Sequence, residues 1–264
     1  MIMRKEVQYK SSILKEVIDL KIIIPTESNI EKVLIFLHGK LEPERDCSLI
    51  EKMFEDMDVN TLTEKYKMAI VTPCMGNQYY IDLPSYKNSL FLADELPEAI
   101  KKICFVNSDV EILIGGISMG GYGAVLCSAI SGKFDRIISI SGSYIQDDII
   151  IGNCEVWGRK QPTVESTEGT FLKNFLPVED LERNIYKNVV PALDLFGERK
   201  QMPYVVMTCG TNDWLYTRNK KFEDELIRRN IKHIMIEIPG GNHDADCFKE
   251  GLWEAMKALC SQNE

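Results

Sequence analysis

Six short, predominantly apolar runs recur along the chain, and helical spacing of apolar residues follows several of them. The runs cover residues 33–37, 68–72, 110–114, 136–140, 204–208 and 234–238. An apolar run that is continuous rather than alternating is typical of a strand buried on both faces of a sheet. Strands that alternate with helices imply parallel strands joined by right-handed crossovers. The sequence therefore predicts an open, mostly parallel α/β sheet with helices on both faces.

The remaining elements follow the same spacing rules. Helices are expected over 90–103, 119–130, 218–229 and 247–259, and an opening pair of strands over 7–10 and 17–24. Between 143 and 202 the alternation breaks down, and so long a gap inside a compact α/β domain is typical of an insertion or lid over a functional site. Because 264 residues fit one α/β unit, we expect a single domain over 1–264, with 143–202 as an inserted, lid-like segment.

Composition excludes several classes of protein. The chain is 45% hydrophobic and 27% charged, which is ordinary for a globular protein and unlike a disordered or collagen-like chain. Its formal net charge is −9, whereas nucleic-acid and anionic-membrane binders present basic surfaces. It contains no run of 18 or more apolar residues and no apolar signal-peptide segment. We therefore expect no nucleic-acid or membrane partner; a homo-oligomer is compatible with the sequence.

The eight cysteines are scattered and form no C-x-x-C pair. Disulfide frameworks belong mainly to small secreted chains. Several of these cysteines, such as Cys104 and Cys127, stand in apolar runs, where a free thiol acts as a small buried hydrophobe. Cysteine and histidine never occur at zinc-ligand spacing. The sequence therefore predicts reduced thiols, a cytoplasmic location, and no metal or other cofactor.

One strand ends in a glycine-rich turn that can carry chemistry. Gly116-Ile117-Ser118-Met119-Gly120 is a G-x-S-x-G motif between the apolar run 110–114 and a helix of small residues. A serine on so tight a turn projects its hydroxyl from the carboxyl edge of the sheet, and the glycines let strand and helix approach closely. The helix N-terminus favours developing negative charge. The motif predicts a nucleophile at Ser118; a glycine-rich turn with a capping serine is the structural alternative.

A nucleophilic serine needs a general base, and the chain has three histidines: His38, His233 and His243. In the chain order Ser, Asp or Glu, His, the base follows the serine. His38 precedes Ser118, and His233 opens a predicted strand. His243 lies in a loop after the last predicted strand and is the expected base, with an ordinary surface-loop histidine as the alternative.

The acid that orients this base should end the preceding strand. Asp213 follows the strand over 204–208, in the order strand, turn, carboxylate. It would hold the tautomer of the imidazole and stabilise the imidazolium without taking the proton. Asp194, inside the predicted insertion, and Asp244, adjacent to His243, are the competing candidates.

Two backbone N–H groups should hold the oxyanion that forms when a serine attacks a carbonyl. The first is expected from Met119, the residue after the serine. The second should come from the loop after an early strand, where Leu37-His38-Gly39 leads to Lys40. An ordinary strand-to-loop turn is the alternative for that stretch.

Taken together, these stretches resemble the α/β-hydrolase superfamily, and within it the esterase branch of tributyrin esterases, S-formylglutathione hydrolases (esterase D) and feruloyl or acetylxylan esterases. The resemblance is carried, in the family's order, by 37–39, 79–82, 95–97, 116–124, 209–213 and 240–243. It implies a serine carboxylesterase for short-chain acyl or aryl esters, with Ser118, Asp213 and His243 as its triad. It also implies that Tyr80 lines the substrate pocket beside the oxyanion loop, where we place His38 as well.

Three alternatives use the same fold differently. An acyltransferase would pass the acyl group to an alcohol or thiol instead of water. A thioesterase of the S-formylglutathione hydrolase type would cleave a thioester with the same triad. A hydrolase-fold binding protein would have lost catalysis, although all three triad positions carry competent residue types. For the leading interpretation, the expected partner is a small-molecule ester.

Overall fold

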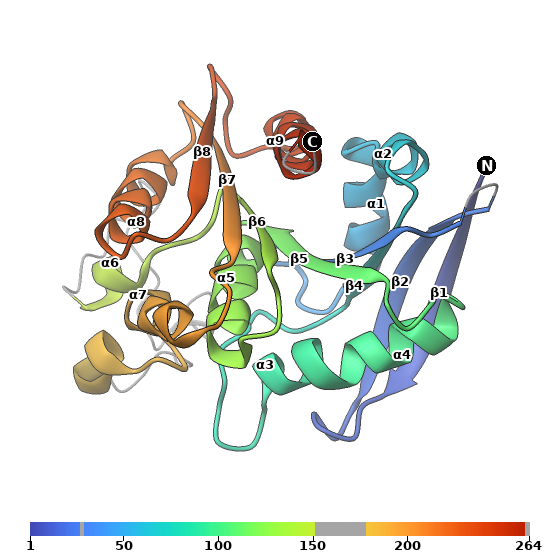
Figure 1. Ribbon diagram of the computed structural model, residues 1–264, viewed down its shortest axis with the longest axis horizontal. Coiled ribbons are helices and arrows are strands. Elements are labelled where there is room, and N and C mark those ends of the chain that lie inside the picture. The colour runs from blue at the N-terminus through green and yellow to red at the C-terminus, as the bar shows by residue number, and fades with distance from the viewer. Residues whose placement is uncertain (27–28, 151–177, 262–264) are drawn as a thin grey trace.

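The buried apolar runs form the centre of a single sheet. The computed structural model describes residues 1–26, 29–150 and 178–261 (Figure 1). Within them, eight strands are arranged in the order β1-β2-β4-β3-β5-β6-β7-β8. They are β1 Ile2–Lys10, β2 Val17–Pro25, β3 Lys32–Leu37, β4 Met68–Pro73, β5 Glu111–Ile117, β6 Arg136–Ile140, β7 Tyr204–Gly210 and β8 His233–Ile238. β2 pairs antiparallel with β1 and β4, and every pairing from β4 to β8 is parallel.

The helices of the described residues cover both faces of this sheet. They are α1 Ser48–Asp56, α2 Val59–Lys65, α3 Asn88–Leu90, the π segment η1 Phe91–Glu95, α4 Leu96–Ile103, α5 Met119–Ser131, α6 Gln146–Ile150, the 3-10 segment η3 Val178–Arg183, α7 Val189–Ala192, the 3-10 segment η4 Leu193–Glu198, α8 Tyr216–Arg228 and α9 Ala245–Cys260. None of these helices is both long enough and apolar enough to cross a membrane.

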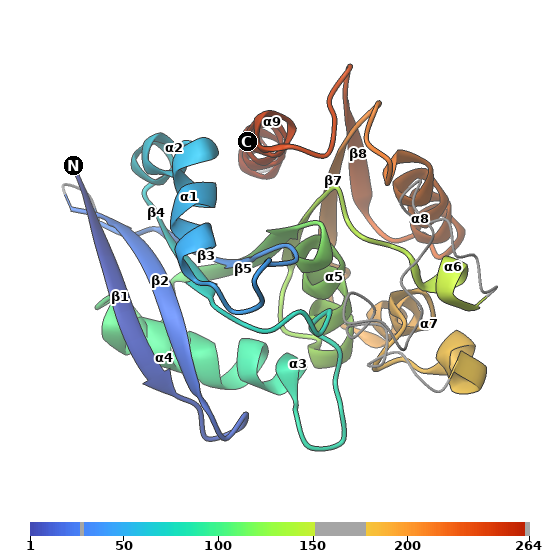
Figure 2. The same cartoon turned by 180° about the vertical axis from the view of Figure 1, so that it is seen from behind.

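Two hydrophobic clusters, one on each face of the sheet, form the core. One cluster joins the sheet to α1, α2 and α9, and the other joins it to α4, α5 and α8. Figures 1 and 2 show these two groups of helices on opposite sides of the strands. β3 and β4 are buried along almost their whole length, whereas the edge strand β1 alternates between exposed and half-buried residues. The predicted α/β sheet with helices on both faces is confirmed.

The helix expected over 90–103 contains an irregular turn. It begins at Asn88 and passes through the π segment η1 before continuing as α4. Pro97 lies in the first turn of α4. Its ring lacks an N–H and crowds the carbonyl four residues earlier, at Ala93, so a wider turn relieves the clash. The periodicity predicted the helix correctly but not this widening.

The segment predicted as an insertion, 143–202, is described only at its two ends. Residues 151–177, which include Trp157 and Phe171, lie outside the described residues. The described parts form α6, η3, α7 and η4, and Leu181, Val189 and Phe196 are buried in the same cluster as α5. These ends therefore belong to the core. A lid over 143–202 and a single domain over 1–264 stay predictions.

The prediction that all thiols are reduced is wrong for one pair. Cys47, just before α1, and Cys74, just after β4, form a disulfide with a Cα–Cα distance of 5.7 Å. The two residues are 27 positions apart, and only the pairing of β4 with its neighbours brings them together. Among the described residues, Cys104, Cys127, Cys209, Cys247 and Cys260 are free. The predicted cytoplasmic location loses the support it took from reduced thiols.

Candidate active site

Ser118 occupies a strained turn between β5 and α5. Its φ of 52° and ψ of −116° lie in a region that non-glycine residues rarely adopt. The turn is held by the Ser118 N–H, which donates to the Ile140 carbonyl at 2.9 Å. A Cβ at Gly120 would lie 2.0 Å from the Leu37 carbonyl oxygen, so only glycine fits there. The G-x-S-x-G motif therefore forms the sharp strand–turn–helix expected of it.

His243 bridges Ser118 and Asp213. Its Nε2 lies 3.2 Å from the Ser118 Oγ, and its Nδ1 lies 2.8 Å from the Asp213 Oδ2. Its ring contacts the rings of Trp214 and Phe248, with centroids 5.2 Å and 4.9 Å away. These aromatic neighbours restrict the orientation of the imidazole, while its side chain stays 21% exposed and open to a ligand.

Asp213 is held as a carboxylate in a buried position. The side chain has no exposed surface, and its Oδ1 accepts the Leu215 N–H at 2.8 Å. Burial by itself raises the pKa of this carboxyl, but hydrogen bonding and charge from His243, together with the Leu215 N–H, outweigh it and lower the pKa. An ionised Asp213 keeps the proton of a neutral His243 on Nδ1, which leaves Nε2 as an acceptor toward Ser118.

The competing candidates have other partners. The Asp194 carboxylate accepts from the Arg229 Nε at 2.6 Å, on the surface. Asp244 caps α9, its Oδ1 accepting the Cys247 N–H at 3.0 Å. His233 lies at the start of β8, where its Nδ1 is 2.7 Å from the Ile231 carbonyl. Asp213 is thus the candidate acid that contacts His243.

Two loops that carry the acid and the base are tied together by hydrogen bonds that the sequence reasoning did not find. The Asn212 N–H donates to the Gly241 carbonyl at 2.9 Å, and its side-chain amide donates to the Gly240 carbonyl at 3.2 Å. In return, the Gly240 N–H donates to the Thr211 Oγ1 at 2.8 Å. The polar pair Thr211-Asn212 just before Asp213 was the signal available in the sequence.

His38 is placed beneath the predicted oxyanion segment. Its side chain is fully buried, its Nε2 accepts the Met75 N–H at 3.0 Å, and its Nδ1 lies 2.6 Å from the Gly39 carbonyl. Because the Met75 N–H can only donate, the ring proton must sit on Nδ1 and point to Gly39. Burial lowers the pKa of His38 to about 4, although its two backbone hydrogen bonds oppose the shift. His38 is therefore a neutral anchor of this segment at physiological pH.

Tyr80 supports the same segment from the loop after β4. Its hydroxyl donates to the His38 carbonyl at 3.0 Å, and only 1% of the residue is exposed. Tyr79 and Tyr80 both have a φ of 55°, a conformation that costs energy in non-glycine residues. Both His38 and Tyr80 thus position the segment Gly39–Lys40, and their contact with substrate stays a prediction.

The segment Gly39–Lys40 runs beside the serine. A Cβ on Gly39 would lie 3.4 Å from the Ser118 Cβ. Met119 is the first residue of α5, where backbone N–H groups have no partner within the helix. The two predicted oxyanion donors, Lys40 and Met119, therefore flank Ser118, and their role at an oxyanion stays a prediction.

Neither a nearby thiol nor a metal cluster offers competing chemistry. Burial raises the pKa of Cys247 to about 11, and the charges of Asp213 and Asp244 add to the shift. The thiol is therefore protonated at neutral pH and is a poor nucleophile. In the part of the chain that the structure describes, no group of three or more His, Cys, Asp or Glu side chains could hold a metal ion.

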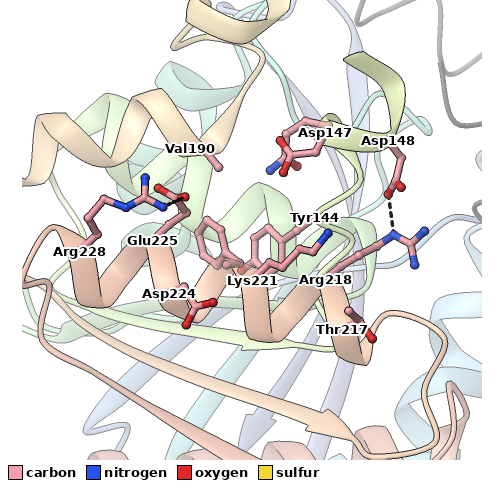
Figure 3. A pocket seen from close by; sticks show the side chains of 12 residues that line it. Tyr144, Asp147, Asp148, Val190, Thr217, Arg218, Lys221, Asp224, Glu225 and Arg228 are labelled. Carbon is pink, nitrogen blue, oxygen red and sulfur yellow. Dashed lines mark hydrogen bonds and ion pairs between the residues drawn. The ribbon is translucent and has the colours of Figure 1, made fainter. Parts of the chain in front are cut away.

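Two hollows lie near the carboxyl edge of the sheet. The α1–α9 hollow, of about 230 Å³, is lined by His38, Gly39, Lys40, Leu41, Leu49, Lys52, Met53, Asp56, Met57, Ile117, Ala245 and Phe248. The second hollow, of about 510 Å³, lies between α6, α7 and α8 (Figure 3). Its walls are strongly charged: the Arg218 Nε donates to the Asp148 carboxylate at 2.6 Å, and Arg228 pairs with Glu225. Only the α1–α9 hollow is lined by neighbours of Ser118.

Comparison with known proteins places this geometry. No protein-family model matches the chain. An acetyl esterase from Caldicellulosiruptor saccharolyticus is 24% identical over 230 residues, which are 86% of this chain and 82% of the relative. An S-formylglutathione hydrolase structure from Staphylococcus aureus superposes with a TM-score of 0.77 at 19% identity, covering 98% of this chain and 99% of the other. A ferulic acid esterase structure gives 0.70 at 20% identity, covering 96% and 95%.

The chain has the α/β-hydrolase fold. The predicted fold class is therefore confirmed, and the relatives are of the esterase branch that the sequence resembles. In an α/β-hydrolase sheet, parallel strands end at the same edge, which is where ligands bind. Ser118 follows β5, Asp213 follows β7 and His243 follows β8, so the topology alone brings the three to one edge.

Proposed function

We propose that this protein is a cofactor-free serine carboxylesterase that hydrolyses short-chain acyl or aryl esters of small molecules. The observation that carries the proposal is the continuous contact from Ser118 through His243 to Asp213, at 3.2 Å and 2.8 Å, on a strained turn. This is the order and spacing of groups that activate a serine nucleophile. The acetyl esterase relative supports a short acyl group.

Acylation would proceed through His243 as general base. As the Ser118 Oγ attacks the ester carbonyl, its proton passes to the His243 Nε2. Asp213 stabilises the resulting imidazolium across the 2.8 Å contact and stays ionised. The same Nε2 then returns the proton to the departing alcohol oxygen, and the carbonyl–alcohol bond breaks, leaving an acyl-serine.

The oxyanion and the acyl-enzyme use the neighbouring backbone. The N–H groups of Met119 and Lys40 would donate to the oxyanion, and the start of α5 favours its negative charge. A water molecule, deprotonated by His243, then attacks the acyl-serine carbonyl and releases the acid and the free Ser118 hydroxyl.

The test is Ser118→Ala with p-nitrophenyl acetate and butanoate as substrates. Wild type should show a burst of p-nitrophenol and steady turnover, and a fluorophosphonate probe should label one serine. Ser118→Ala should lose the burst and the label with an unchanged circular dichroism spectrum. Ser261→Ala, an exposed serine after α9, is the matched control and should keep both. Wild-type turnover in Ser118→Ala would overturn the proposal.

A thioesterase is the second candidate, favoured by structural likeness. An S-formylglutathione hydrolase from Agrobacterium tumefaciens also superposes, with a TM-score of 0.69 at 15% identity over 97% of this chain. Comparing kcat/KM for S-formylglutathione with that for acetyl esters distinguishes the two activities. Added alcohols that capture the acyl group would indicate acyl transfer, and failure of probe labelling would indicate a binding protein.

A further inference from the structure

The α1–α9 hollow begins at the proposed oxyanion segment and leads away from the nucleophile. Gly39, Lys40 and Ile117 line it, and these are direct chain neighbours or close contacts of Ser118. A group bonded to a carbonyl on Ser118 could therefore extend into it. This hollow is absent from the mechanism above, which uses only atoms at the reacting bond.

Apolar side chains from two helices form the opposing walls. Leu49 and Met53 stand four residues apart on α1, so they share one face of that helix. Ala245 and Phe248, three residues apart in the first turn of α9, face them. Leu49, Met53 and Phe248 are half-buried, so part of each apolar side chain is available to a ligand.

Charge at the hollow is balanced. Lys52 and Asp56 also line it and are exposed, and they lie four residues apart on the same face of α1. One positive and one negative side chain give no net attraction for a charged ligand. The walls therefore favour an uncharged, apolar group.

We propose that the α1–α9 hollow binds an unbranched hydrocarbon arm of the ester substrate, and this rests on the proposed esterase function. The volume of about 230 Å³, at roughly 30 Å³ for each water-sized group, holds about six to eight methylene or methyl groups. Each buried methylene should raise kcat/KM about fourfold until the hollow is full. Met53 is a specificity-determining residue because it lies in the middle of the α1 wall.

The arm belongs either to the acyl group or to the alcohol, and two substrate series separate these sources. Methyl esters from acetate to decanoate extend the acyl arm alone. Acetate esters from methanol to decanol extend the alcohol arm alone. Methyl acetate is short at both ends and reports on the proposed triad without the hollow. Proton release at constant pH measures hydrolysis of every member.

Met53→Trp, Met53→Ala and a control, Glu55→Trp, test the site with both series. Glu55 is on the same helix, and its side chain is 68% exposed and outside the hollow. Wild type and Glu55→Trp should show kcat/KM rising about fourfold per methylene in one series. Met53→Trp should lose at least tenfold with the hexyl or hexanoyl substrate yet stay within about twofold on methyl acetate. Met53→Ala should move the optimum to a longer arm.

Each outcome decides a different proposal. If methyl acetate is hydrolysed but neither series depends on arm length, or if Met53→Trp and Glu55→Trp have the same length profile, the hydrocarbon site is wrong and the esterase proposal stands. If wild type hydrolyses none of the esters, both are wrong. Thermal melts of the three variants establish that each is folded at the assay temperature.

Discussion

Replacing Asp213 by asparagine removes the charge that orients the proposed base while keeping the shape of the side chain. The Asp213 Oδ2 now accepts from the His243 Nδ1 at 2.8 Å. An asparagine amide at that position would donate instead, so the imidazole would carry its proton on Nε2 and face Ser118 with a donor. In that tautomer His243 cannot take the serine proton.

The expected loss is large in kcat and small in stability. For a Ser-His-Asp site, the wrong tautomer costs about 10,000-fold in kcat, which is roughly 5 kcal/mol of barrier. The asparagine carbonyl oxygen can still accept the Leu215 N–H, which Asp213 accepts at 2.8 Å. The free energy of unfolding should therefore fall by only about 1–3 kcal/mol, the usual cost of one impaired buried hydrogen bond.

The assay is steady-state hydrolysis of a p-nitrophenyl ester at neutral pH, with urea unfolding in parallel. Asp244→Asn is the matched control, because it makes the same charge change one residue from His243, and asparagine caps a helix as well as aspartate does. It should keep kcat within about threefold. The reasoning is refuted if Asp213→Asn keeps more than a tenth of wild-type kcat, or if both variants lose activity equally.

Three further predictions concern stability. Gly120→Ala would place a Cβ 2.0 Å from a β3 carbonyl oxygen, and should lower the free energy of unfolding by about 3 kcal/mol or more; Gly197→Ala, with no atom within 4 Å of its Cβ, should change it by about 0.5 kcal/mol or less, and equal effects would contradict this. Reducing Cys47–Cys74, which closes a loop with a sequence separation of 27, should cost about 3–4 kcal/mol in urea unfolding on the chain-entropy estimate, and dithiothreitol should have no such effect on the Cys47→Ser/Cys74→Ser double variant. The pKa of buried His38 falls to about 4 in the folded chain, so the unfolded chain binds the extra proton between pH 6.5 and 4; stability should be complete above that window and fall by about 3 kcal/mol as the pH drops through it, and His38→Gln should remove that part of the slope in unfolding measured from pH 7 to pH 4.5.

Much of the fold could be read from local pattern. The central strands were predictable because continuous apolar runs are unstable anywhere but between two covered faces, and β3 and β4 are buried as expected. The short helices α1 and α2 were not predicted. Charged residues crowd their sequences, and their buried residues, such as Ile50 and Phe54, gain their meaning only from the sheet face they cover.

The site was predictable in its residues but not in its supports. Motif, chain order and the scarcity of histidine singled out Ser118, Asp213 and His243 before any coordinates. The hydrogen bonds from Thr211 and Asn212 to the histidine loop were not predictable, because they join residues about 29 positions apart through backbone groups that every residue carries.

The sequence by itself determined the order of strands and helices and the residue types at the carboxyl edge, because apolar periodicity and glycine geometry act within a few neighbouring residues. Only the tertiary structure decided which side chains meet. It fixed His38 as a buried, neutral anchor, linked Cys47 to Cys74, and opened a hollow between α1 and α9. Each of these depends on packing between segments far apart in the chain, and such packing is set by the whole sheet rather than by local pattern.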